Sequence, residues 1–565
     1  MSEQYEQSPE HTAPLRVACI GGGPGGLFAA IALAKRIPGT TIDVFERNAA
    51  SDVFGFGVVF SDATLDNVDA TDPVLRDTLS EHGRRWDSIE VHSKGVVTAV
   101  GGNGMSAVHR RILIEALQGR AAALGAHLHF STTTTVAELD QQGYDLIVAA
   151  DGANSASRRS FEDELGHSVD EAAVKFIWFG TTYQFDGLTF LHTRNEHGNF
   201  AVHAYPIGSG LSTFIVETDE DTWRRAGLDG FDMSAPPGES DLTTQRYLEQ
   251  LFADQIDGQS LVANNSRWAN FRTRRTRQWH TRTEAGTSIV FLGDAVHTAH
   301  FSVGSGTKMA MEDAAVLAES VADHRDDLTA GLDAFQRARQ PMVDKIQDSS
   351  MPSLSWWDHF AEYYQALEPW QFGFHFFSRA ISAEKMRVRD PEFVESAENA
   401  WEQTYGARPL QTSLRIGSVD LATRLLHVVD QDADTITVGV GTATITANTT
   451  HTGDAALVDA PDVDHTALDD TTRAALDDIC SARPSAVILR GGTPLARVLC
   501  AEHVRFVHRT PAIIIDQPSS LRSRRAVDEK DCAATLVLSG RADAVAFDSA
   551  DAGAGRVLES AEVAR

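Results

Sequence analysis

The chain has 565 residues, of which 42% are hydrophobic and 23% are charged, and its mean hydropathy is −0.21. This composition is typical of a globular protein and excludes a wholly disordered chain and a multi-span membrane protein. The 79 acidic residues outnumber the 49 basic ones, and the resulting formal net charge of −30 argues against nucleic acid as a partner.

The leader and the cysteines indicate where the protein is located. Residues 1–14 are polar and acidic, so we expect a disordered leader without a secretory signal, and a cytoplasmic protein. No segment approaches the roughly 18 consecutive apolar residues of a membrane span, so no membrane partner is expected. The four cysteines lie far apart and form no CxxC pair, which argues against a disulfide framework and against a metal site.

The first predicted elements form a strand–helix–strand unit, in which a glycine-rich turn opens the helix. Later apolar segments have the same character, and each is bounded by turn residues. Short apolar strands of this kind are typical of a parallel sheet that is covered on both faces, so we predict an α/β domain over 15–175 and 280–345. The predicted strands are 16–20, 41–45, 145–150 and 288–292.

An insertion of different character interrupts this domain. Residues 176–279 contain strands separated by turn clusters, which predicts an antiparallel sheet. Residues 346–408 are predicted to form a helical connector that is rich in aromatic side chains, and residues 409–565 are richer in Ala, Asp, Thr and Val. We therefore expect a β-rich domain, a helical connector and a separate C-terminal domain. The strands expected in the insertion are 189–192, 198–205 and 211–217.

The turn at the start of the chain fits the pattern GxGxxG, with Gly21, Gly23 and Gly26 at the glycine positions. Gly21 permits a tight turn, Gly23 lets the backbone approach a pyrophosphate, and Gly26 lets the helix pack closely on the strand. The free N–H groups at the helix N-terminus bind the anion. Glu46, 20 residues after Gly26, is predicted to accept from the ribose hydroxyls, and we assign Arg47 to the same cofactor. The pattern predicts a dinucleotide but does not separate NAD from FAD.

Three further motifs resemble those of the single-component FAD-dependent aromatic hydroxylases, which have the para-hydroxybenzoate hydroxylase fold. Asp151-Gly152 resembles their DG motif, Gly293-Asp294 resembles their GD motif, and Arg110 resembles the arginine that opens a helix near the FAD pyrophosphate. The resemblance implies that Arg110, Asp151 and Asp294 bind FAD, with Asp294 at the ribityl chain. It also implies a Rossmann-like FAD domain, discontinuous in sequence, with a substrate-binding domain over 176–279 that covers the flavin.

The segment after the GD motif departs from the family pattern. Where the family has Pro-Pro and a later Asn, this chain has His300-Phe301 and Lys308. This form resembles a narrower subgroup that hydroxylates aromatic CoA thioesters, the salicylyl-CoA 5-hydroxylases and 2-aminobenzoyl-CoA monooxygenases. The residues of this segment that the resemblance assigns to FAD are Gly304, Gly306, Thr307 and Lys308.

The resemblance implies an aromatic monooxygenase. NADH or NADPH reduces FAD, and the reduced flavin forms a C4a-hydroperoxide with O2 that attacks an electron-rich ring. The expected substrate is an aromatic acyl-CoA, with salicylyl-CoA converted to gentisyl-CoA by 5-hydroxylation. As alternatives, 2-aminobenzoyl-CoA or a free aromatic or indole substrate stays open, as does a flavin-binding regulatory module without turnover. The choice between NADH and NADPH is also left open, and so is a homodimer.

Two residues near the flavin are candidates for catalysis. Lys308 either places a positive charge beside the reduced flavin or points to solvent and contacts the flavin through its backbone N–H alone. His300 either relays a proton at the substrate hydroxyl or packs as an ordinary pocket histidine.

Four residues are candidates for binding the substrate. His203 and Tyr205 share one face of a predicted strand, and alternation does not tell which face meets the ring. Arg274 and Arg275 belong to the densest basic stretch of this acidic chain, and we assign them to the CoA phosphates.

The C-terminal segment resembles an old-yellow-enzyme-like barrel, with its opening at 409–417 and its closing strand at 539–547. A complete barrel needs about 250 residues, which is more than 409–565 provides. We therefore expect a degenerate, partial α/β barrel without FMN that serves as a structural or dimerising appendage.

Overall fold

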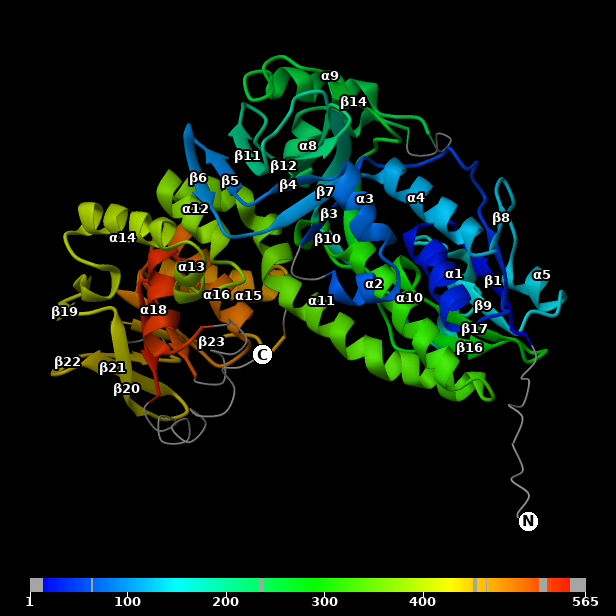
Figure 1. Ribbon diagram of the computed structural model, residues 1–565. Helices are drawn as coiled ribbons and strands as arrows, with labels where there is room; N and C mark the ends of the chain where they lie inside the picture. Colours follow the sequence, from blue (N-terminus) through cyan, green and yellow to red (C-terminus); the bar gives the residue numbers. More distant parts are fainter. Residues whose placement is uncertain are drawn as a thin grey trace, which may run out of the picture.

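The structure is a computed structural model, and it describes residues 14–61, 65–232, 238–450, 455–463, 465–517 and 526–548. Residues 1–13 of the predicted leader lie outside this described part. Figure 1 shows a sheet-and-helix lobe at the N-terminal end and a barrel at the C-terminal end, with a long helix running between them. Among the described residues, none of the helices combines the length and the apolar character that a membrane span requires.

A six-stranded sheet forms the centre of the N-terminal lobe. Its strands are β1 Arg16–Ile20, β2 Thr41–Phe45, β8 His127–His129, β9 Leu146–Ala149, β16 His280–Arg282 and β17 Ser288–Phe291. The order is β16-β17-β9-β1-β2-β8, and every pair is parallel except β16 with β17. Ile20 pairs with both Phe45 and Ala149, so the carboxyl ends of three predicted strands meet at one edge. This confirms the Rossmann-like sheet.

Helices pack around this sheet, and the helix that follows the glycine turn contacts two others. It lies against α4 and α10, and a Cβ on Gly25 would stand only 2.8 Å from the side chain of Leu292. The glycine therefore permits the close packing here. The helices of this lobe are α1 Pro24–Arg36, α2 Asp66–Thr71, α3 Val74–His82, α4 Arg110–Ala123, α5 Val136–Asp140, α6 Ala156–Arg159, α7 Glu162–Leu165 and α10 Gly306–Asp323, with the short 3-10 turns η3 Gly293–Ala295 and η4 Phe301–Val303.

The insertion folds as the predicted β-rich domain around an eight-stranded sheet. The path runs β14-β10-β13-β12-β11-β5-β6, and β15 pairs with β10. Strands β5 and β6 join this sheet although they precede the insertion in sequence, because β5 pairs in parallel with β11. The strands are β5 Ile89–Ser93, β6 Val96–Val100, β10 His167–Thr181, β11 Leu188–Arg194, β12 Asn199–Gly208, β13 Leu211–Thr218, β14 Leu261–Val262 and β15 Ala269–Thr276.

Smaller elements complete this domain and join it to the Rossmann-like sheet. A three-stranded sheet, β3-β7-β4, contacts β12 through β7 and β4. These elements are β3 Gly57–Ser61, β4 Arg84–Trp86, β7 Met105–His109, α8 Glu220–Arg225, η2 Leu228–Gly230 and α9 Leu242–Leu251.

The connector is helical, as predicted, and its first helix is the longest of the described elements. This helix, α11, spans 39 residues from Leu328 to Ala366 and contains Pro341 and Pro352. Near its end, Trp356 and Trp357 are buried with Phe372 and Phe376 against the β-rich domain. The remaining connector helices are α12 Pro369–Phe377, α13 Ala383–Arg389 and α14 Pro391–Tyr405.

The C-terminal domain is a barrel, but the seven strands close instead of leaving a partial barrel. Strand β26 pairs in parallel with β20, which completes the circuit. The antiparallel run β20-β21-β22 makes this closure possible with a short chain, because hairpins need no crossover helix. The strands are β20 Leu425–Gln431, β21 Thr435–Val440, β22 Ala443–Asn448, β23 Ala455–Asp459, β24 Ala486–Arg490, β25 Ala512–Asp516 and β26 Ala544–Phe547.

The interior of the barrel is filled by aliphatic side chains. Ile436, Ile488 and Ile513 are buried there together, whereas the alternate residues Leu489 and Ile514 face the helices outside. The barrel is therefore a packed core and not a pore. The other elements of the domain are α15 Asp470–Ser481, α16 Pro494–Phe506, α18 Glu529–Leu538, η5 Pro409–Gln411 and the hairpin strands β18 Leu414–Ile416 and β19 Val419–Leu421.

Candidate functional site

The glycine turn lies at the carboxyl edge of the Rossmann-like sheet, and each glycine has a distinct environment. Gly21 has a φ of +109°, and a Cβ there would stand 2.4 Å from the carbonyl oxygen of Ala150. A Cβ on Gly26 would stand 2.0 Å from the carbonyl oxygen of Gly21. A Cβ on Gly23 would meet nothing within 4 Å, because Gly23 lines a large cavity. The turn is thus tight on its protein side and open on its cavity side.

Glu46 lies at the end of β2, next to the glycine turn. Its Oε2 accepts from the backbone N–H of Gly22 at 2.8 Å, and its Oε1 accepts from the backbone N–H of Asn48 at 2.9 Å. The carboxylate therefore holds the turn in place, and its contact with a ribose stays a prediction. Arg47 is exposed and does not line the cavity.

The two aspartates of the DG and GD motifs have different environments. The Asp151 carboxylate accepts from the hydroxyl of Ser155 at 2.5 Å and from the backbone N–H of Ser157 at 3.0 Å, so it stabilises the start of α6. Its neighbour Gly152 lines the cavity, whereas Asp151 does not. The Asp294 side chain is open to the cavity and has no hydrogen-bond partner in the described part of the chain.

Asp294 is deep in the protein although its carboxylate faces the cavity. Burial raises the pKa of Asp294, and the positive charges of Arg110 and Arg274 oppose the rise. Arg110 begins α4 and lines the same cavity, and burial lowers its pKa. An unpartnered carboxylate and a half-buried arginine beside an open glycine fit the hydroxyls and the diphosphate of FAD.

The N-terminus of α10 faces the cavity, and Gly304, Gly306 and Thr307 line it. Lys308 does not: its ammonium lies 3.0 Å from Oε1 of Glu312, one turn along the helix. Neither of the two orientations left open for Lys308 is found, because its ammonium is directed at Glu312 and not at the cavity or at solvent. The positive charge offered to the cavity is therefore that of the helix N-terminus.

A buried ionic network fixes this helix. Asp313 accepts from the backbone N–H of Gly293 at 3.0 Å and from Arg339 at 2.9 Å, and it lies 2.7 Å from Nε2 of His297. Burial alone would raise the pKa of Asp313, but His297 and Arg339 outweigh it and lower the pKa. His297 is thus structural, and it links the GD motif to α10.

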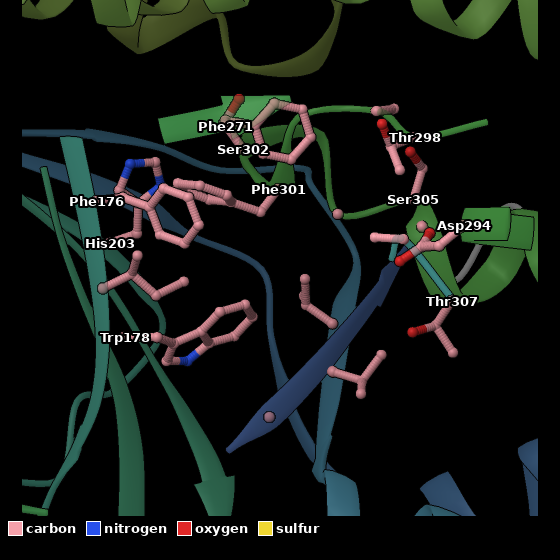
Figure 2. A pocket seen from close by; sticks show the side chains of 18 of the residues that line it. Phe176, Trp178, His203, Phe271, Asp294, Thr298, Phe301, Ser302, Ser305 and Thr307 are labelled. Carbon is pink, nitrogen blue, oxygen red and sulfur yellow. The ribbon is translucent and has the colours of Figure 1, made fainter. Parts of the chain in front are cut away.

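The opposite end of the cavity is aromatic. Figure 2 shows Phe176, Trp178 and Phe301 at one end, and Asp294 and Thr307 at the other. The cavity has a volume of about 1060 Å³, at the upper end of the range for ligand pockets. It therefore has room for a flavin and a second planar ligand, with the polar end suited to the first and the aromatic end to the second.

His203 lines the aromatic end, which settles the face of β12 that meets the cavity. Tyr205, two residues on, lines it as well, whereas Val202 and Ala204 pack into the core on the other side of the sheet. Nε2 of His203 is hydrogen-bonded to Oε1 of Glu217, which is 1% exposed.

Glu217 is not among the residues that the sequence predicts for the site. Burial raises the pKa of Glu217 well above its usual range, and burial lowers the pKa of His203 well below its own. Both pKa directions follow from the removal of solvent around this buried pair. The available signal was an acidic residue at the end of the apolar strand 211–217.

His300 lies behind the aromatic end and does not line the cavity. Its Nδ1 is 2.8 Å from the hydroxyl of Ser302, and its Nε2 is 4.0 Å from Oε2 of Glu217. Burial lowers the pKa of His300 to about 3, so it is neutral at ordinary pH. Its contacts are those of a packed histidine, and a proton-relay role stays a prediction.

The basic stretch on β15 divides between the cavity and the outer surface. Arg274 lines the cavity, whereas Arg275 lies outside it, with Asp348 at 2.8 Å. Arg272 lines the cavity but pairs with Glu171 at 2.7 Å. The structure therefore brings together Gly23, Arg110, His203, Tyr205, Arg274, Asp294, Gly304, Gly306 and Thr307 around one cavity.

Comparisons with known proteins agree with this geometry. Salicyloyl-CoA 5-hydroxylase of Streptomyces sp is 50% identical over 94% of this chain and 99% of its own. The 3-hydroxy-4-methyl-anthranilyl-(aryl-carrier protein) 5-monooxygenase of Streptosporangium sibiricum is 32% identical over 60% of this chain and 89% of its own. Protodeoxyviolaceinate monooxygenase of Chromobacterium violaceum is 30% identical over 61% of this chain and 89% of its own. Residues 14–350 match the FAD binding domain family, and the chain belongs to that family.

Proposed function

We propose that this protein is an FAD-dependent monooxygenase that hydroxylates the ring of an aromatic acyl-CoA, using NAD(P)H and O2. The preferred substrate is salicylyl-CoA, which becomes gentisyl-CoA by hydroxylation at C5. The observation that carries the proposal is the single cavity that has the open glycine turn and Asp294 at one end and an aromatic enclosure at the other.

The chain supplies binding and orientation at each end of this cavity. The N–H groups at the start of α1, next to Gly23, would hold the FAD diphosphate, and Asp294 would accept from a hydroxyl of the cofactor. The N-terminus of α10 would stabilise negative charge on the reduced isoalloxazine. Bound FAD would accept a hydride from NAD(P)H and activate O2 for transfer to the ring.

The aromatic end would hold the substrate ring and exclude water. Phe176, Trp178, Phe271 and Phe301 line it, with Phe176 and Phe301 ring centroids 5.1 Å apart. Flat apolar walls fit an arene, and a dry site protects the activated oxygen from loss to solvent. The imidazole of His203 is a polar group in this wall, and it would orient a substituent of the substrate ring.

The relative in Streptomyces supports the choice of a CoA thioester. It is named salicyloyl-CoA 5-hydroxylase, and the match covers 99% of its length, so it extends through the C-terminal barrel. The two less similar relatives match only about 60% of this chain. A 2-aminobenzoyl thioester is the second candidate, because one of these relatives is named for an anthranilyl group on a carrier protein.

The test is turnover with defined substrates. Salicylyl-CoA, free salicylate and 2-aminobenzoyl-CoA are added separately to the purified protein with NADH or NADPH. We expect salicylyl-CoA to accelerate flavin reduction and to yield a hydroxylated thioester. Flavin binding without turnover on any of the three would instead favour a flavin-binding module. Cofactor released from the same protein should be FAD without FMN, because aliphatic side chains fill the barrel.

The setting of the enzyme is part of the same proposal. We propose a cytoplasmic location, where NAD(P)H and CoA thioesters are supplied together, and a homodimer as the assembly. Light scattering of the purified protein measures the second point directly, and a monomer would contradict it.

A further inference from the structure

Cations gather around the cavity in a chain that is otherwise strongly acidic. The formal net charge of the chain is −30, but the lining of the cavity has the opposite balance, with six lysines and arginines against the two acidic residues Asp229 and Asp294. In the described part of the chain, no carboxylate lies within 4.0 Å of five of its six lining cations, and Lys175, one of these five, donates to the amide oxygen of Asn270 at 2.7 Å. The lining cations are Arg110, Lys175, Arg272, Arg274, Arg379 and Arg389, and the four arginines without a carboxylate partner are Arg110, Arg274, Arg379 and Arg389.

These four arginines form two groups at different places. Burial lowers the pKa values of Arg110 and Arg274, and the negative charge of the nearby Asp294 opposes this lowering in both. They belong to the end of the cavity that we assign to FAD. Arg379 and Arg389 belong to the connector, on the loop after α12 and at the end of α13. The cavity therefore has a second set of unpaired positive charges that the cofactor site does not explain.

Arg379 is half-buried, and its contacts within the described part of the chain are with neutral groups. Its Nε donates to the hydroxyl of Ser353 at 3.0 Å, its Nη1 donates to the carbonyl oxygen of Phe376 at 2.6 Å, and its guanidinium lies 3.9 Å from the centre of the Phe376 ring. Burial and the charge of Arg541 lower the pKa of Arg379 to about 9. Its charge also lowers the pKa of His203, so it lies near the aromatic end. A half-buried cation without a counter-charge is stabilised by a ligand that supplies one.

Arg389 lies at the rim of the same cavity and is exposed. Its Nη1 donates to Oδ1 of Asn103 at 3.1 Å, and the next residue, Asp390, accepts from the backbone N–H of Gly101 at 2.7 Å. Gly102 has a φ of +70°, and a Cβ on it would stand 2.6 Å from Cγ of Arg389. The turn between β6 and β7 is thus shaped to hold Arg389 at the rim.

The basic stretch that the sequence favoured for phosphate is already neutralised in part. Arg272 pairs with Glu171 at 2.7 Å and Arg275 with Asp348 at 2.8 Å. Guanidinium groups that already have carboxylate partners bind a phosphate less favourably than unpaired ones. Arg379 and Arg389 of the connector are therefore better suited to bind a phosphate than Arg272 and Arg275 of β15.

We propose that Arg389 and Arg379 form the subsite for the phosphate-bearing thioester arm of the substrate. Arg389, at the rim, binds a phosphate of the CoA moiety, and Arg379, inside, donates to the carbonyl oxygen of the thioester. The proposal rests on the proposed function and adds the route of the arm, along the connector. The pyridine nucleotide carries phosphates too, so the experiment must separate the two ligands.

The test compares two thioesters of the same acid. Salicylyl-CoA carries phosphates, whereas salicylyl-N-acetylcysteamine has the same thioester carbonyl without them. Arg389→Glu should raise the KM for salicylyl-CoA about tenfold or more, because one charge-assisted contact is lost. The KM for the short thioester should stay unchanged, and the effect on salicylyl-CoA should shrink at high salt. Lys385→Glu is the matched control, since Lys385 is exposed on the same helix and does not line the cavity.

Arg379→Met tests the inner half of the subsite. It should raise the KM for both thioesters, because both carry the carbonyl group. The FAD content and the thermal midpoint of this variant are measured first, and if it fails to fold, Arg389→Glu decides alone.

Three outcomes would overturn the inference. An unchanged KM for salicylyl-CoA in Arg389→Glu, an equal effect of Lys385→Glu, or a raised KM for NAD(P)H alone would each do so, and the last would assign the subsite to the pyridine nucleotide. Failure of the wild-type enzyme to hydroxylate either thioester is a different result. It would overturn the proposed substrate, and with it the subsite, before any variant is compared.

Discussion

Gly23 offers a sharp test of the cofactor site, because a methyl group there disturbs the cavity and nothing else. Its φ is −79°, which any residue adopts, and a Cβ would meet nothing within 4 Å. Gly23→Ala should therefore change the free energy of unfolding of the apoprotein by no more than about 1 kcal/mol. The weaker N-cap and the reduced entropy of the unfolded chain act in opposite directions.

The effect of Gly23→Ala on FAD should be much larger. The methyl group would hold the diphosphate away from the N–H groups of α1, with the loss of at least one charge-assisted hydrogen bond worth about 1.5–3 kcal/mol. The Kd for FAD should rise about ten- to a hundredfold. Titration of apoprotein followed by flavin fluorescence measures the Kd, and urea unfolding of the same samples measures stability.

Gly26→Ala is the matched control for this experiment. The added Cβ would lie 2.0 Å from the carbonyl oxygen of Gly21, so the backbone of the turn itself must shift. We expect the apoprotein to lose about 3 kcal/mol or more, in contrast to Gly23→Ala. If Gly23→Ala bound FAD as tightly as the wild type, the diphosphate would not lie at this turn and the reasoning would be refuted.

The other predictions concern the GD motif, a buried histidine and the barrel. Asp294→Ala should weaken FAD binding about tenfold or more, because its unpartnered carboxylate is lost; a purified variant with a full complement of flavin would contradict this. His192→Phe should raise the free energy of unfolding by about 1 kcal/mol, because both ring nitrogens of His192 are buried without a partner. Burial lowers the pKa of His192 from 6.5 to about 3, so the wild type keeps its full stability above pH 6.5 and loses it as the pH falls toward 3. The variant should lose less over that range in urea titrations, and an equal loss would argue against the assignment. Glu502→Leu should lower the free energy of unfolding by about 3–5 kcal/mol, because His375 and Arg541 lose their shared carboxylate; an unchanged thermal midpoint would exclude this role.

The Rossmann-like lobe could be predicted because its signals are local. The glycine spacing, the apolar strands and the two aspartate motifs each depend on a few consecutive residues, and the structure confirms the predicted sheet. The ion pair of Lys308 with Glu312 was also readable, since the two residues are one helical turn apart. The resemblance to a family led us to consider the flavin and solvent for Lys308 but not its neighbour.

The remainder depends on contacts between distant segments. Strand β5 pairs with β11 from almost 100 residues away, and β26 closes the barrel on β20 from more than 100 residues away. The pairing of Glu217 with His203 likewise requires the register of β12 and β13. Arg379 and Arg389 come together at the cavity only in the folded chain, where their described side-chain contacts are with neutral groups. Such features follow from tertiary packing, which no local pattern encodes.

The helix α11 has a consequence for how the two ends of the molecule depend on each other. At 39 residues it is about 58 Å long. Near its start Arg339 is paired with Asp313 of α10, and near its end Tyr363 donates to Glu502 of α16 at 2.6 Å. One continuous helix is therefore anchored in both lobes. A chain that ends before the barrel would leave the buried phenol of Tyr363 without its acceptor and would expose apolar side chains of the connector to water. The C-terminal domain therefore stabilises the hydroxylase lobe to which α11 joins it.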